Sequence, residues 1–220
     1  GISAAGMYGQ LTTGTSTVTT ANPSVGGGTL PDASVMSLEL DNLNLFAGVG
    51  ASLDDKSTPT AADDEISLES AIGFAIIGGS IQFASVRPGG LLAGDLRAYT
   101  GVEISLLGAT LVGIDGLVFT ADGSVLVNQA TDPVGAASTD RIDWADATDT
   151  GGLLPDFGAG LTESIELQVA GSASVDVFGF VVGTATFEMT TGTSTVTTAN
   201  ANVGGGTLTD ASVMSLELDN

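Results

Sequence analysis

Hydrophobic and polar residues alternate with a period of two along much of the chain. Between Ser164 and Met189 the apolar positions of this pattern are Ile165, Leu167, Val169, Val175, Val177, Ala185, Phe187 and Met189. The same alternation recurs in 37–53, 72–86 and 102–129, and Gly or Asp interrupts it at intervals typical of turns. Period-two alternation between turn residues indicates β-strands, so we predict an all-β fold.

Two segments depart from this pattern and carry signals of a helix start. In PTAADDEISLESA (59–71), Thr60 is placed to cap a helix whose first turn holds Asp63, Asp64 and Glu65. Carboxylates in a first turn interact favourably with the helix dipole. STDRIDWADAT (138–148) is similar, so we expect a helix of one or two turns in each segment.

A 31-residue sequence segment occurs twice in the chain. It begins at Thr12 and again at Thr190, a spacing of 178 residues, and only three of its positions differ. Near-identical copies at a fixed spacing indicate a tandem array. We therefore predict one complete repeat unit at 12–189, the start of the next at 190–220 and the end of the preceding one at 1–11.

The junction between the copies bears on the architecture. No Pro-rich or Ser-rich linker separates Met189 from Thr190, which favours continuous stacking in which each copy covers the next. We expect an elongated β-solenoid-like rod or a continuous β-rod built of tandem repeats. The alternative is a series of β-sandwich modules, although a sandwich of about 100 residues fits a 178-residue unit neither once nor twice.

Charge restricts the classes of partner. The net charge is −22 because Lys56, Arg87, Arg97 and Arg141 are the only cations, while acidic residues occur at an ordinary frequency. Binding to nucleic acid or anionic lipid needs clustered cations, so neither is expected. Ser70–Val86, an apolar run without charge, has only 17 residues and includes Gly and Gln, which disfavours membrane insertion.

Catalysis is not expected either. The chain has neither Cys nor His, which removes thiolate and imidazole chemistry. It also lacks the G-x-S-x-G motif of a serine nucleophile. A glycosidase pair of carboxylates works in an aromatic-lined cleft, and only 5% of the residues are aromatic.

The unpaired carboxylates raise the possibility of calcium, the hard cation that protein oxygen atoms usually bind. Two acidic segments supply the candidate ligands, which are Asp54, Asp55, Asp63, Asp64 and Glu65 in the first and Asp140, Asp143, Asp146 and Asp149 in the second. Neither segment has EF-hand spacing, and solvated turns are the alternative interpretation. Trp144, the only Trp, either belongs to the core or stacks on a sugar beside the second segment.

Four phrases of the unit resemble those of long repeats in giant bacterial surface or secreted proteins of the adhesin-like, RTX-associated kind. They are NLFAGVGASL (44–53), GFAIIGGSI (73–81), IDWA (142–145) and GFVVGTATFE (179–188). The resemblance implies an extracellular or cell-surface location and a structural role in an adhesin stalk, matrix or filament. It supplies no site residue. The implied partners are neighbouring repeat copies or identical chains, and the alternatives are a module that binds a surface glycan and a self-assembling filament subunit.

Overall fold

The computed structural model describes residues 2–5, 8–60 and 63–220, and the predicted all-β class is confirmed. The strands are β1 (Ile2–Ala5), β2 (Tyr8–Thr19), β3 (Thr29–Val49), β4 (Ser52–Asp54), β5 (Glu65–Ser67), β6 (Ile72–Arg87), β7 (Ala98–Val112), β8 (Leu117–Thr131), β9 (Ala137–Ser138), β10 (Thr148–Asp149), β11 (Ile165–Val177), β12 (Val181–Thr197) and β13 (Thr207–Asp219). Two short 3-10 turns, η1 (Gly26–Gly28) and η3 (Gly204–Gly206), accompany them. In the described part of the chain, no helix has the length and apolar character needed to cross a bilayer.

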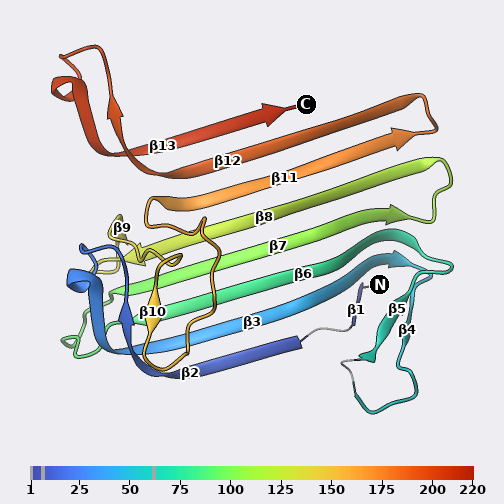
Figure 1. Cartoon of the computed structure of the whole chain (residues 1–220), viewed down its shortest axis with the longest axis horizontal. Helices are drawn as coiled ribbons and strands as arrows, with labels where there is room; N and C mark the ends of the chain where they lie inside the picture. Colours follow the sequence, from blue (N-terminus) through green and yellow to red (C-terminus); the bar gives the residue numbers. More distant parts are fainter. Residues whose placement is uncertain (1, 6–7, 61–62) are drawn as a thin grey trace.

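Eight long strands form one antiparallel sheet in the order β2-β3-β6-β7-β8-β11-β12-β13, so successive long strands lie side by side (Figure 1). β1, β9 and β10 extend this sheet, while β4 and β5 form a separate hairpin. Because each long strand pairs with the next one along the chain, the chain crosses the sheet as a meander, with the β4–β5 hairpin inserted between β3 and β6 and residues 132–164 between β8 and β11. No solenoid coil is present among the residues that the structure describes.

One face of the sheet is covered at one end by a long irregular segment, residues 139–164, which we call the lid (Figure 1). Under it lies the main core, to which the strands contribute Val18, Val35, Val86, Tyr99, Leu126 and Ala130, and the lid Ile142, Trp144, Phe157 and Leu161. We call this side of the sheet the lid face and the opposite side the bare face. The β4–β5 hairpin covers a second, smaller part of the lid face, where Ile66 and Leu68 pack on Phe46 and Ala75.

Both helix predictions are wrong for the residues described. Glu65–Ser67, in the middle of the first predicted helix, pairs with Ser52–Asp54 as a strand, and residues 61–62 lie outside the described part. The segment 138–148 is irregular and ends in β10. Its backbone makes local turn bonds and also bonds to a distant part of the lid, because Trp144 N donates to Leu161 O at 3.0 Å. Tertiary contacts therefore override the local helix signals.

Candidate functional site

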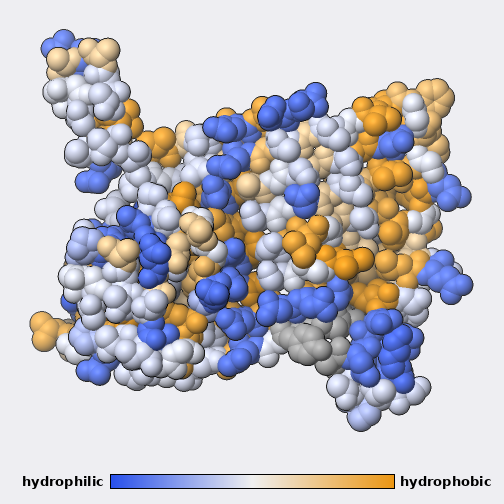
Figure 2. Space-filling model, viewed as in Figure 1, coloured by the Kyte–Doolittle hydropathy of each residue, from blue (hydrophilic) through white to orange (hydrophobic). Residues whose placement is uncertain are grey.

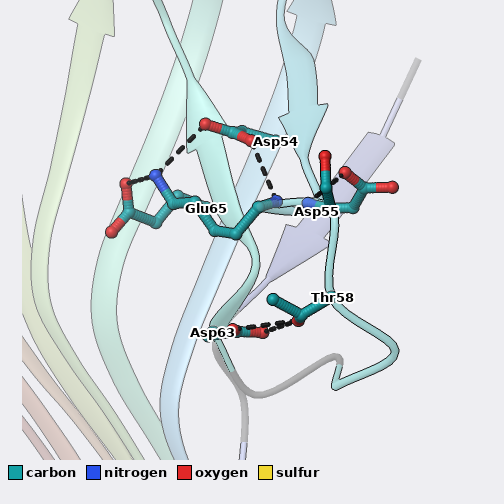
Figure 3. A network of polar contacts seen from close by, with 7 residues as sticks. Asp54, Asp55, Thr58, Asp63 and Glu65 are labelled. Carbon is teal, nitrogen blue, oxygen red and sulfur yellow. Dashed lines mark hydrogen bonds and ion pairs between the residues drawn. The ribbon is translucent and has the colours of Figure 1, made fainter.

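The first acidic segment forms the tip of the β4–β5 hairpin, and four of its five carboxylates, those of Asp54, Asp55, Asp63 and Glu65, are bonded to donors of the same tip (Figure 3). Lys56 Nζ lies 3.1 Å from Asp54 Oδ2 and 2.8 Å from Glu65 Oε2. Asp55 Oδ1 accepts from Ser57 N at 2.9 Å, and Thr58 Oγ1 donates to Asp63 at 2.8 Å. The tip thus places Asp54 and Glu65 together around Lys56 and holds Asp55 and Asp63 elsewhere.

These contacts favour the charged forms of Asp54 and Lys56 but do not assemble a metal cage. The backbone N–H and the ammonium of Lys56 lower the pKa of Asp54, and the bonds to Glu65 and Asp54 raise the pKa of Lys56. Among the described residues, no group of three Asp or Glu is arranged to hold a metal ion. Calcium binding stays a prediction from the sequence, and a fall in melting temperature (Tm) on adding EDTA would support it.

The second acidic segment belongs to the lid, where its carboxylates have separate surroundings. Asp140 and Asp146 are exposed. Asp149 bonds its own loop, because its carboxylate accepts from Gly151 N at 2.9 Å and from Leu153 N at 3.0 Å. Burial opposes ionisation of Asp149, but hydrogen bonds that include these outweigh it and lower its pKa.

Asp143 is the buried acid of the lid, with only 7% of its surface exposed. Burial raises its pKa to about 6, and the neighbouring carboxyl group of Glu163 contributes to the rise. Within the described part of the chain, Asp143 Oδ1 has no hydrogen-bond partner, and neither has Nη1 of the buried Arg141, whose Nη2 contacts Glu166 Oε2 at 3.1 Å. Burial of the charges of Asp143 and Arg141 at this end of the lid therefore lowers the stability of the fold.

Asn128, on β8, is the polar anchor of the lid. It is completely buried, and its Nδ2 donates to Ile142 O at 2.8 Å and to Thr162 O at 2.9 Å. Its Oδ1 accepts from Trp144 Nε1 at 3.0 Å. Trp144 is 1% exposed, so of its two predicted roles the structure places it in the core.

The lid is also bonded to the first hairpin, formed by β2, η1 and β3. Thr20 Oγ1 accepts from Asp143 N at 3.0 Å, and Asn22 Nδ2 donates to Arg141 O at 2.8 Å. Further on, β10 pairs with the end of β2. The sequence analysis missed Asn128, Thr20 and Asn22. Asn128 was detectable, because the strand run VLVNQA (125–130) is apolar on both faces and places it between Leu126 and Ala130.

The second hairpin, formed by β12, η3 and β13, repeats the conformation of the first. Thr20 N donates to Gly28 O at 3.0 Å, and the equivalent Thr198 N donates to Gly206 O at the same distance. The φ angles of Gly26–Gly28 are 58°, 72° and 89°, against 56°, 70° and 92° for Gly204–Gly206. Both hairpins also carry one pairing irregularity at the same place in the repeated text. The hairpin therefore takes this shape with or without a lid.

Coverage is what differs between the two hairpins. Val18 is 0% exposed under the lid, whereas the equivalent Val196 is 37% exposed. Val35 and Val213 differ likewise, at 1% and 36%. The end of the second hairpin stands clear of the rest of the molecule, and the end of the first lies against the lid (Figures 1 and 2). The second hairpin thus presents a preformed apolar surface of the kind that the lid covers in the first.

Comparison with models of known protein families, with curated proteins and with solved structures finds no match.

Proposed function

We propose that this chain is a structural repeat of a large extracellular bacterial protein, whose copies join edge to edge into one continuous antiparallel sheet. The observation that carries the proposal is strand β12, which runs through the junction between Met189 and Thr190 without interruption. Its first part ends one copy of the unit and its last part begins the next. The extracellular location and the stalk or matrix role derive from the resemblance of the four phrases quoted above.

The pairing of β12 supports this proposal. On one side it pairs with β11, where Gln168 lies opposite Thr190, and on the other with β13, where Thr190 lies opposite Ser215. The equivalent pair in the first copy is Thr12 and Ser37, in the same register. The edge of β2 away from β3 is therefore the place where a preceding copy's β11 would lie.

Repetition of this arrangement sets the dimensions of the array. One unit contributes six long strands, which are β2, β3, β6, β7, β8 and β11. Neighbouring strands lie about 4.8 Å apart, so each added unit lengthens the sheet by about 29 Å. Small-angle X-ray scattering on the chain and on a version extended by one 178-residue unit measures this increment. Units that scatter as independently moving bodies would contradict the proposal.

A matched pair of substitutions gives a second test. In the chain described here, Val18→Ala removes two buried methyl groups and should cost about 2 kcal/mol of unfolding free energy, whereas Val196→Ala should cost little. In the extended version, residues from the added unit cover the second hairpin. Val196→Ala should then become as costly as Val18→Ala, and an unchanged small effect would argue that the added copy does not repeat the lid arrangement of the first.

A further inference from the structure

The bare face of the sheet is apolar across its full width. The pairing register brings seven side chains from seven strands into one row, Leu40, Ile81, Ile104, Val125, Val169, Met189 and Leu216. A second row contains Leu11, Leu38, Phe83, Val102, Val127, Leu167, Thr191 and Met214. Further along the strands, Phe74 and Phe119 meet edge to face with ring centroids 6.0 Å apart.

None of these residues is buried by the described part of the chain. On the lid face, the row of Val35, Val86, Tyr99 and Ala130 is at most 5% exposed. On the bare face, no member of the two rows is buried, and Leu11, Met214 and Leu216 are each more than 60% exposed. Both the lid and the β4–β5 hairpin lie on the other side of the sheet. A contiguous apolar face of this size on a soluble protein marks an interaction surface.

Charge separates the two faces. The acidic residues in the central part of the long strands lie on the lid face, and they are Glu39, Glu103, Asp122, Glu188 and Glu217. Figure 2 shows that face, with hydrophilic residues across the middle of the sheet. The rows of the bare face contain no charged residue. Its partner therefore has an uncharged apolar surface, and a net charge of −22 disfavours an anionic lipid surface.

We propose that the bare face packs against the bare face of a second copy of this chain, forming a two-layered sandwich. Eight strands at about 4.8 Å spacing, with about nine residues of apolar length at about 3.4 Å each, give roughly 1,200 Å² per face. The pair would bury about 2,400 Å², which is as much as stable protein interfaces need. A second copy presents the same bare face, and that face is the flat, apolar and uncharged surface that the partner must have.

The charges do not oppose this arrangement. Packed sheets lie about 10 Å apart, and the carboxylates of each copy extend away from the other. The two acidic layers are then separated by more than the Debye length of about 8 Å at physiological ionic strength, so their repulsion is screened. This inference concerns the face of the sheet and is independent of the edge-to-edge joining proposed above.

Sedimentation of the whole chain with two neighbouring substitutions tests the proposal. Val125→Asp places a carboxylate in the middle of the bare face, and Ser124→Asp places the same charge on the lid face one residue away, outside the lid. We expect the unchanged chain and Ser124→Asp to sediment at twice the 21.7 kDa of one chain. Val125→Asp should sediment as a monomer whose circular dichroism is unchanged. A monomeric unchanged chain at several hundred micromolar, or a Val125→Asp dimer, would overturn the proposal.

Thiol labelling keeps the proposal testable even if Val125→Asp does not fold. The chain contains no Cys, so one introduced thiol reports a single place. Ala121→Cys lies on the bare face and Ser124→Cys on the lid face. Ala121→Cys should react with a maleimide at least tenfold more slowly, and dilution should remove the difference. Equal rates at high concentration, or flotation of a monomer with phosphatidylcholine vesicles, would refute the second-copy partner, and flotation would assign the face to lipid.

Discussion

Replacement of Asn128 tests whether the lid is held by this one buried amide. Asn128→Leu has a similar volume but removes three hydrogen bonds, those to Ile142 O, Thr162 O and Trp144 Nε1. Each bond contributes about 0.5–1.5 kcal/mol, and a buried group left without a partner costs about 1–3 kcal/mol. The apolar replacement recovers part of this loss. We expect the free energy of unfolding to fall by about 3–5 kcal/mol.

The assay uses Trp144, the only Trp of the chain, which packs against Phe157 with ring centroids 5.4 Å apart. Urea titration followed by Trp fluorescence reports the lid, and far-UV circular dichroism reports the sheet. Gln129→Leu is the matched control, because Gln129 is exposed on the same strand and should change stability by less than about 0.5 kcal/mol.

In the native Asn128→Leu protein, Trp emission should also shift to longer wavelength, because the indole loses its buried bond. A stability loss below about 1 kcal/mol, with emission unchanged, would refute the idea that Asn128 anchors the lid. A loss seen by circular dichroism but not by fluorescence would show that the sheet, not the lid, depends on this residue.

Three further predictions concern the lid and its surroundings. Because folding raises the pKa of Asp143 to about 6, the stability it contributes is fully present below about pH 4 and is lost as the pH rises through 6. The unfolding free energy of the chain relative to that of Asp143→Asn should therefore be about 2–3 kcal/mol lower at pH 7.5 than near pH 4 in urea titrations. Gly101→Ala should lower Tm by several degrees, because the added methyl would lie 2.7 Å from the Trp144 ring, whereas Gly183→Ala, with open space around it, should leave Tm unchanged in calorimetry. Lys56→Met should leave the midpoint of urea unfolding nearly unchanged, because both of its ion pairs are exposed.

The sequence predicted the strands where alternation and turns agree. The alternation of Ile165, Leu167 and Val169 identified β11, and the apolar positions up to Met189 identified β12. Alternation also predicts which residues of a strand lie on the same face of the sheet, because it is a local property of the strand. Alternation does not show which face of the sheet a distant segment covers, so the sequence left both the solenoid-like rod and the sandwich modules open.

The lid lay beyond sequence reasoning because its conformation depends on contacts far along the chain. Asp143 bonds Thr20 across 123 residues, and Asn22 bonds Arg141 across 119. Local composition favoured a helix there, and the sequence grouped its acids as candidate calcium ligands, which the described structure does not bring together. Trp144 shows the same limit, because a lone aromatic among acids fits a core position and an exposed one equally well.

The count of long strands in one unit has a geometric consequence. Six is an even number, so a chain that enters a unit pointing in one direction leaves it pointing in the same direction, with its pleat in the same phase. Every lid in an array would then project from one side. Loss or gain of a hairpin changes the count by two and preserves this polarity, whereas a single strand added or removed would turn the next unit upside down. The design therefore tolerates length variation in whole hairpins only.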